Sequence, residues 1–355
     1  MINKNFWKNK KVLITGHTGF KGGWLSVWMN ILGARISGYS LDPITKKNFF
    51  DATKIKNIFS KDFRKDIKDY KSLENCIKTT KPEIIFHLAA QPQVLESYIN
   101  PMNTIVSNII GTVNLLEITR KYNFIKSVVI ITTDKVYQNN EKKLKFSEQD
   151  HLGGDDIYSS SKACADILSI SYLKSFFSDS NCGIATARAG NCIGGGDWTK
   201  FRILTDASDS FISNKPLKIR NPHSRRPWQH VLEPLLGYLI IAEKIYGNNK
   251  LSLNTAWNLG PGRKIHLKVL EFAKIFKQKM NSKSKLIISK KNDKKEKKNL
   301  DLDSTRAKKI LKWKPFLSIT QTLQLTADWY LAHKNKKDMF NFTKSQIIEF
   351  MKSCE

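Results

Sequence analysis

Residues 11–23 read KVLITGHTGFKGG, and this stretch decides the fold. Residues 11–15 form a short apolar run of strand length, glycines follow at 16, 19 and 22, and apolar side chains then recur at helical spacing through Leu32. A glycine motif between a strand and a helix predicts a dinucleotide site, because glycines let a pyrophosphate approach the backbone at the helix N-terminus.

Strand and helix patterns continue to alternate downstream. We predict strands at 35–40, 83–88, 127–132 and 182–188, and helices at 70–80, 103–122 and 158–177. This alternation indicates an α/β protein with a Rossmann-type doubly wound parallel sheet and a smaller, interleaved C-terminal substrate domain. A helix near 232–246 and a run at 256–260 are expected to rejoin the sheet. The dinucleotide-binding domain is therefore expected at 1–188 and about 228–262, and the substrate domain at 189–227 and 263–355.

Charge and composition exclude several classes of protein. The 355 residues carry 60 Lys and Arg against 31 Asp and Glu, a net charge of +29. We interpret this excess as a compositional bias, because the lysines are spread along the whole chain, and we expect no nucleic-acid partner. The dense basic run at 290–298 is interpreted as a solvated loop.

No apolar run approaches the roughly 20 residues of a membrane helix, and the N-terminus lacks the apolar segment of a secretory signal. A cytoplasmic protein without membrane contact is expected. The five cysteines show no metal-ligand spacing, so we predict reduced thiols and no metal site.

Two acidic positions are candidates for the adenosine end of a dinucleotide. Asp42 lies about 20 residues beyond the glycines, where an acid hydrogen-bonds the ribose and favours NAD over NADP. Its other interpretation is a turn residue before Pro43. Asp66 and Ile67 follow the next loop, where they contact the adenine or, alternatively, Asp66 caps a helix.

Tyr158 and Lys162 are four residues apart on a predicted helix, so both project from one face. A free phenol has a pKa near 10 and is a poor base at neutral pH. A nearby ammonium and a cationic nicotinamide favour its ionised form. Taken alone, this spacing is mostly found on helix surfaces. Its place among the motifs below gives Tyr158 the expected role of removing a hydroxyl proton while hydride leaves the same carbon.

Four motifs in order resemble the extended short-chain dehydrogenase/reductase family: TGHTGFKG at 15–22, LAAQ at 88–91, NIIGT at 108–112 and YSSSK at 158–162. The resemblance implies NAD as the cofactor. It also implies these cofactor-binding residues: Gly16, Gly19, Phe20, Gly22, Ser40, Asp42, Asp66, Ile67, Ala89, Ala90, Gln91, Asn108, Tyr158 and Lys162.

The segment Thr133-Asp134-Lys135 refines this resemblance. Dehydratases of the family carry Thr-Asp-Glu, with the Asp as acid and the Glu as base in loss of water across C5 and C6 of a hexose. Lysine in place of Glu, together with GGGDW at 194–198 and RPWQHV at 226–231, resembles the CDP-glucose 4,6-dehydratase subgroup.

That resemblance implies conversion of CDP-D-glucose to CDP-4-keto-6-deoxy-D-glucose, with C4 oxidised first and hydride returned to C6. The implied catalytic residues are Thr133, Asp134, Lys135, Tyr158 and Lys162. The alternative is an NAD-dependent epimerase, or a dehydratase of a dTDP-, GDP- or UDP-hexose.

Lys135 has two possible roles, because a lysine near its ordinary pKa of about 10.4 is protonated and is no base. Desolvation, Lys162 and the nicotinamide cation would lower its pKa and expose an amine that takes the C5 proton, the role we favour. Otherwise Lys135 stays charged and stabilises the developing enolate.

The nucleotide sugar needs cations of fixed geometry for its diphosphate. Arg226 is the first candidate, Arg220 the second, and Asn191 stands at the start of the substrate domain. Trp198 either stacks on the base or belongs to the core between domains. Family members pair through the helices that begin near 103 and 158, which implies a homodimer or a higher homo-oligomer.

Overall fold

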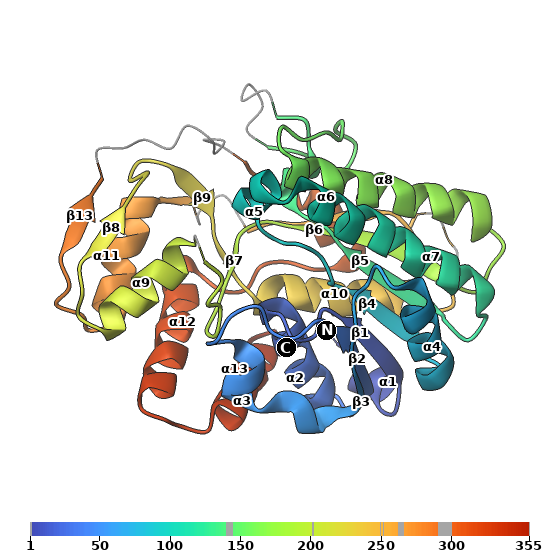
Figure 1. Cartoon of the computed structure of the whole chain (residues 1–355), viewed down its shortest axis with the longest axis horizontal. Coiled ribbons are helices and arrows are strands. Elements are labelled where there is room, and N and C mark those ends of the chain that lie inside the picture. Colours follow the sequence, from blue (N-terminus) through green and yellow to red (C-terminus); the bar gives the residue numbers. More distant parts are fainter. Residues whose placement is uncertain are drawn as a thin grey trace.

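A seven-stranded parallel sheet runs through the centre of the protein (Figure 1). The structure is a computed structural model that describes residues 2–139, 145–200, 202–248, 250, 252–261, 266–289 and 300–354, and the basic run at 290–298 lies outside these residues. The strand order is β11-β6-β5-β4-β1-β2-β3, and every neighbouring pair is parallel. The strands are β1 (Lys11–Thr15), β2 (Arg35–Ser40), β3 (Phe59–Arg64), β4 (Ile84–His87), β5 (Ser127–Ile131), β6 (Gly183–Ala189) and β11 (Ala256–Leu259).

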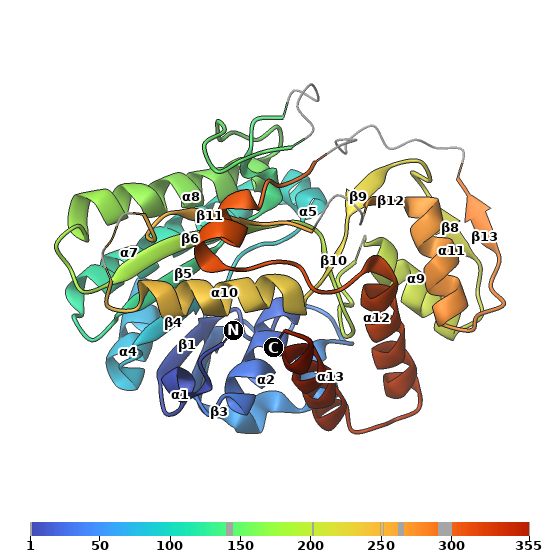
Figure 2. The same ribbon diagram turned by 180° about the vertical axis from the view of Figure 1, so that it is seen from behind.

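Helices cover both faces of the sheet (Figures 1 and 2). One face carries α2 (Phe20–Ile31) and α10 (Leu232–Ile245), and the other carries α4 (Tyr70–Thr80), α7 (Gly111–Lys121) and α8 (Ile157–Phe176). Successive strand residues point to opposite faces. Val12 and Ile14 therefore enter one apolar core, whereas Leu13 enters the other. Burial on both faces explains why these strands are continuous apolar runs.

The chain leaves the sheet twice and forms a second, smaller unit beside it. The first excursion contains β7 (Cys192–Ile193), α9 (Ile203–Ile212), β8 (Leu217–Ile219), β9 (Arg225–Pro227) and β10 (Gln229–His230). The second contains β12 (His266–Lys268), α11 (Val269–Lys279) and β13 (Leu286–Ile288). Because β8 pairs with β13 and β9 pairs with β12, the two excursions are interleaved, as expected. The exact domain boundaries stay predictions.

The last two helices return to the body of the protein. Helix α12 (Ile319–Lys334) packs against α11, and α13 (Met339–Ser353) packs against α2 and the short α3 (Phe49–Thr53). Helix α1 (Lys4–Trp7) precedes β1. In the described ranges no helix is long and apolar enough to cross a membrane. All five cysteines are free thiols, as predicted.

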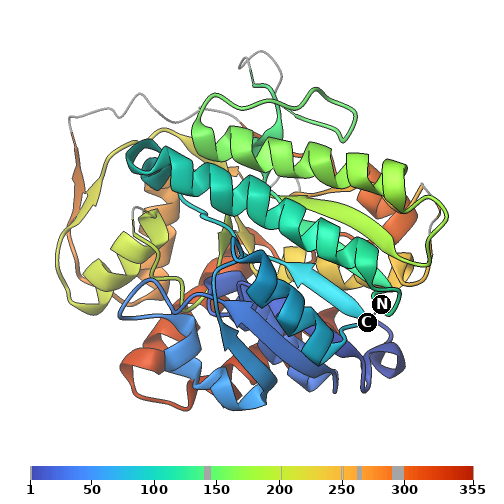
Figure 3. The ribbon, with the colours of Figure 1, turned by 45° about the vertical axis from the view of Figure 1, so that its right-hand side comes forward.

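Two differences from the sequence prediction concern the sheet and the helices beside it. Strand β3 was not predicted, because it is an edge strand whose residues are only partly buried and lack an apolar run. The single helix predicted at 103–122 is divided into α6 (Pro101–Ile105), a π-helical turn (Val106–Ile110) and α7. Helix α5 (Val94–Ile99) precedes this group. Figure 3 shows α7 and α8 lying side by side over the sheet.

Candidate active site

The glycine turn after β1 allows no side chain at two of its positions. Gly16 has φ +75°, and a Cβ there would lie 2.7 Å from the backbone nitrogen of Ala89. A Cβ at Gly22 would lie 2.2 Å from the carbonyl oxygen of Gly16. Gly19 is the N-cap of α2. The backbone therefore stays open at the helix N-terminus, the arrangement in which amide N–H groups hold a pyrophosphate.

The ends of β1 and β4 are joined by a buried polar network. The Thr15 hydroxyl accepts a hydrogen bond from the backbone N–H of Ala89 (3.2 Å) and lies 2.9 Å from His87 Nδ1. His87 Nε2 lies 3.1 Å from the Thr112 hydroxyl. Burial lowers the pKa of His87 to about 3, so the ring is neutral and serves as a structural link between the sheet and α7.

Asn108 lies in the π-helical turn, and both the oxygen and the nitrogen of its side-chain amide form hydrogen bonds. Its oxygen accepts from the backbone N–H of Gln91 (2.8 Å), and its nitrogen donates to the Gln91 carbonyl (3.1 Å) and the Ser161 hydroxyl (2.9 Å). Asn108 was predicted as a cofactor-binding residue. Its described contacts tie the loop after β4, which contains Ala90 and Gln91, to the helix that bears Tyr158, and its contact with a cofactor stays a prediction.

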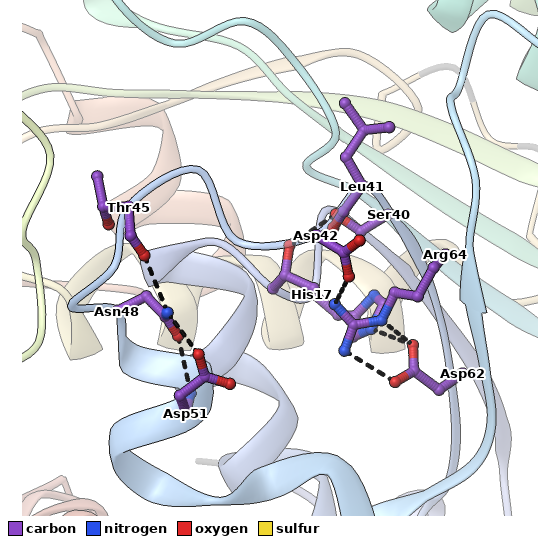
Figure 4. Close-up of polar contacts among 10 residues, drawn as sticks. His17, Ser40, Leu41, Asp42, Thr45, Asn48, Asp51, Asp62 and Arg64 are labelled. Atoms are coloured by element: carbon purple, nitrogen blue, oxygen red, sulfur yellow. Dashed lines mark hydrogen bonds and ion pairs between the residues drawn. The ribbon is translucent and has the colours of Figure 1, made fainter.

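A charged cluster lies at the carboxyl ends of β2 and β3 (Figure 4). Arg64 donates to Asp62 and, at 3.3 Å, to Asp42, and its guanidinium stacks on the ring of Phe50. Burial opposes ionisation of Asp62, but hydrogen bonds from His17 and Arg64 outweigh it and hold the pKa of Asp62 at about 2. The Asp42 side chain is 83% exposed. It therefore has a free face, which suits contact with a ribose.

The loop that carries Asp42 is tied back to the glycine turn. The hydroxyls of Ser40 and Thr18 lie 2.8 Å apart, and Thr18 also donates to the Leu41 carbonyl (2.9 Å). Ser40 is thus brought to the glycine turn from the end of β2. Phe20, the first residue of α2, has its ring against Gly194 of the loop before α9.

Asp66 does not cap the helix that follows it. The N-cap of α4 is Asp69, whose carboxylate accepts from the backbone N–H of Ser72 (3.0 Å). The Asp66 carboxylate accepts from the backbone N–H of Lys68 (3.0 Å), and its carbonyl accepts from the Tyr39 hydroxyl (2.8 Å). Ile67 is nearly buried and packs against Gly111. The helix-cap interpretation of Asp66 is therefore wrong, and a contact with adenine stays a prediction.

Helix α8 places Tyr158 and Lys162 as their spacing predicted. Asp156 caps the helix by accepting from the backbone N–H of Ser159 (2.9 Å), so Tyr158 stands in the first turn. Tyr158 is partly exposed, whereas Lys162 is 6% exposed and donates to the Ile131 carbonyl at the end of β5 (2.8 Å). Burial, with help from Lys21, lowers the pKa of Lys162 to about 8.

The Thr133-Asp134-Lys135 segment forms the rim of the same site. The Thr133 hydroxyl donates to Asp134 Oδ1 (3.0 Å), and Lys135 Nζ lies 3.2 Å from the same oxygen. The Asp134 side chain is 3% exposed and that of Lys135 is 34% exposed. Electrostatic coupling between Lys135 and Tyr158 joins this pair to α8.

The expected lowering of the Lys135 pKa is wrong for this arrangement. Burial does oppose its charge, but the carboxylate of Asp134 and the phenol of Tyr158 outweigh burial and raise the pKa of Lys135. The Asp134 carboxylate, the contact nearest to its ammonium, decides the sign. A base role for Lys135 requires a neutral amine, and the direction of this shift opposes that form.

Two cations of the site were missed from the sequence. Lys21, inside the glycine motif, lies among Cys192, Tyr238 and Tyr158, which outweigh its burial and raise its pKa. Arg202 pairs with Asp197 and is also coupled to Tyr158. The signal for Lys21 was a lone cation between two motif glycines. Arg202 had no local signal, because only the fold brings it near α8.

The substrate-binding candidates are placed differently from one another. Arg226 lies on β9, and its positive charge partly opposes the raised pKa of Lys135. Exposed Arg220 follows β8 and acts on Asp206 of α9. The Asn191 backbone carbonyl accepts from Gln229 (3.1 Å), and its side chain is partly exposed. The charge of Arg226 is thus coupled to the catalytic segment, and that of Arg220 to α9.

Trp198 is 7% exposed and belongs to a core of rings. It makes edge contacts with Trp329, Tyr330 and His333 at centroid separations of 5.1 to 5.7 Å. The core interpretation of Trp198 is therefore confirmed.

This fold, with a Tyr-x-x-x-Lys helix beside a buried acid, defines a Rossmann-type enzyme of the extended short-chain dehydrogenase/reductase class. The chain belongs to the GDP-mannose 4,6 dehydratase family, whose model matches residues 13–326. It is 41% identical to the CDP-glucose 4,6-dehydratase of Salmonella typhimurium over 360 aligned residues, which cover 99% of each chain.

Solved structures share the fold. The dTDP-glucose 4,6-dehydratase of Bacillus anthracis, in complex with NAD, aligns with a TM-score of 0.77 over 93% of this chain and 99% of that one, at 22% identity. The UDP-glucose 4-epimerase of Thermotoga maritima, with UDP-glucose, aligns with a TM-score of 0.79 over 90% of this chain and 98% of that one, also at 22% identity.

Proposed function

We propose that this protein is an NAD-dependent hydro-lyase that converts CDP-D-glucose to CDP-4-keto-6-deoxy-D-glucose. The observation that carries the proposal is Asp134, an almost fully buried acid held between Thr133 and Lys135 beside Tyr158. Epimerisation at C4 needs no such acid, whereas loss of the C6 hydroxyl as water does. The full-length relative of 41% identity supports the choice of CDP-glucose.

The glycine turn fits a dinucleotide, because the positions where a Cβ would collide are those where backbone must approach a pyrophosphate. We assign the pyrophosphate to Gly16, Gly19 and Gly22, and the adenosine ribose to Asp42 and Ser40. NAD held there would supply the hydride chemistry, which is oxidation at C4 of the hexose and reduction at C6.

Side chains of this protein carry out the proton transfers and hold the substrate. Tyr158 takes the proton of the C4 hydroxyl, while Lys162, fixed on the Ile131 carbonyl, supplies positive charge behind it. Arg226 holds the diphosphate at the rim. Thr133 orients Asp134 through the 3.0 Å hydrogen bond.

Elimination then uses Asp134 and Lys135 as one unit. The neutral Lys135 amine takes the C5 proton, and protonated Asp134 gives its proton to the C6 oxygen, which leaves as water. The products on the enzyme are an ammonium and a carboxylate, which correspond to the 3.2 Å ion pair in the structure. The ammonium next returns a proton to C5. The raised pKa of Lys135 favours this ammonium–carboxylate state of the pair.

In the main test, the protein and NAD are incubated separately with a CDP-, a dTDP- and a GDP-hexose. The mass of each product is then measured by mass spectrometry. Loss of one water from CDP-glucose alone is expected. Turnover of a different nucleotide sugar would reassign the substrate, and turnover of none would contradict the proposal.

The role of Lys135 is tested by Lys135→Met in heavy water. This variant should still oxidise C4 but incorporate no deuterium at C5. The matched control is Lys145→Met, which removes a partly exposed lysine paired with Asp303 and should exchange normally. Unchanged C5 exchange in Lys135→Met would refute the base role.

We further propose a homodimer formed through α5, α6 and α8. Large apolar side chains of these helices are exposed: Leu95, Tyr98, Ile99, Met102, Ile157, Ile167 and Phe176. An exposed apolar patch of this kind favours association. Light scattering should give twice the chain mass, and Ile167→Glu should shift the protein toward monomer. Free thiols favour a reducing compartment, so we assign the protein to the cytoplasm.

A further inference from the structure

A pocket lies outside the active site, and its lining residues come from α9, α12, the start of α13 and the segment around α3. Its volume is about 510 Å³, within the range of small-molecule sites. The charged residues that line it are Lys47, Lys54, Lys334, Lys336, Lys337 and Asp209.

Positive charge dominates this pocket. Asp209 is the one carboxylate among its lining residues, and it pairs with Lys47 at 3.3 Å. For the other four lysines, the described part of the chain supplies no carboxylate within ion-pair distance. Like charges gathered around one hollow repel each other. An anion in the hollow would relieve that repulsion.

The floor of the pocket is apolar and aromatic. Trp198, Ile212 and Met339 line it together with His333, whose ring stacks on Trp329. Burial and the nearby Lys47 lower the pKa of His333, so its ring is uncharged at neutral pH. The lysines are the exposed part of the lining, and the uncharged side chains are its buried or partly buried part, with Trp198 and Met339 buried. This layout suits an anion that carries several charges at one end.

We propose that this pocket binds a polyphosphate group, presented by a nucleoside triphosphate or by free polyphosphate, at a site separate from catalysis. Lysines act as point charges toward phosphate oxygens, and several of them match the several charges of a triphosphate. A nucleotide would add contact between its base and the Trp198–His333 floor.

The test compares two variants that lose the same charge. The pocket variant is Lys334→Gln, Lys336→Asn, Lys337→Gln; the control is Lys71→Gln, Lys78→Gln, Lys81→Asn around α4. Lys336 and Lys81 both have left-handed φ (54° and 45°), where asparagine is well tolerated. All six lysines are exposed, so both variants should fold and turn over CDP-glucose at the wild-type rate.

Binding of inorganic tripolyphosphate and of ATP is measured by calorimetry at 0.15 M salt, with NAD and CDP saturating so that the active site is filled. One equivalent should bind, with Kd raised at least about tenfold in the pocket variant and less than about twofold in the control. Tighter binding of ATP than of tripolyphosphate identifies a nucleotide site, and equal binding identifies a polyphosphate site. Absence of binding to the wild type, or equal weakening in both variants, would overturn the proposal.

Discussion

Two ion pairs lie where β5 and β6 end, and they differ in depth. Asp134 and Lys135, 3.2 Å apart, have side chains that are 3% and 34% exposed. Asp166 and Arg188, 2.7 Å apart, are 0% and 3% exposed. Thr132, next to the catalytic segment, donates to Asp166 at 3.0 Å and so connects the shallow pair with the deep one.

The deep pair forms its hydrogen bonds with other buried side chains. Arg188 donates twice to Asp166 and once to the Tyr137 hydroxyl, which donates in turn to Asn258 of β11. This network joins α8, β6 and β11 and faces no substrate. The shallow pair has a cation that reaches solvent. We infer that the deep pair holds the geometry and the shallow pair performs the chemistry.

The largest expected effect is a loss of activity, and it is expected in the catalytic site that contains the shallow pair. Tyr158→Phe removes the group that takes the C4 proton, so kcat should fall by about 10³-fold. The melting temperature should hardly change, because Tyr158 is partly exposed. Steady-state turnover and a thermal melt measure both quantities. A variant that loses stability but keeps its activity would reverse the assignment.

The next effect distinguishes the two carboxylates. Asp166→Asn leaves the Arg188 charge buried without its counter-ion, so the free energy of unfolding should fall by about 3–5 kcal/mol. Asp134→Asn should cost much less stability and reduce kcat by about 10²-fold. Urea unfolding and turnover, applied to both variants, test the contrast. Equal losses of stability would show that depth does not separate the two roles.

A smaller effect, on the pH dependence of stability, is expected for the buried Lys162. Its folded pKa of about 8 is below the ordinary value, so between pH 8 and about 10 the unfolded chain binds more protons. Stability should therefore rise with pH in this window, by up to about 1.4 kcal/mol per pH unit from this group. Urea unfolding at several pH values should show a flatter slope for Lys162→Met. Lys21→Met should narrow this window by raising its lower limit, because Lys21 is one cause of the lowered folded pKa and does not affect the unfolded one. Parallel slopes in all three proteins would contradict this account.

The smallest effect is expected at a third ion pair, that of the exposed Asp42 with Arg64. Asp42→Ala should change stability by less than about 1 kcal/mol, because exposed pairs are screened by solvent. Loss of one hydrogen bond to the ribose should weaken NAD binding about fivefold. Fluorescence titration measures that affinity. Unchanged affinity would leave Asp42 as the turn residue before Pro43.

The sequence alone determined the order of strands and helices around the dinucleotide turn. Strands buried on both faces are continuous apolar runs, and a helix such as α4 carries an apolar period, so each pattern is local. The edge strand β3 has neither pattern, and for that reason it was missed. Tyr158 and Lys162 were placed correctly because a helix converts a spacing of four residues into one face.

Only the tertiary structure decided which polar groups from distant segments meet. Lys21 lies 141 residues before Lys162 in the chain, yet it helps to lower the pKa of that lysine. The pKa of Lys135 is raised because Asp134 and Tyr158 outweigh its burial. A pKa depends on burial and on through-space distance to other charges, and separation along the chain determines neither of these. The sequence therefore identified the reacting groups, and the packing of the fold decided their protonation.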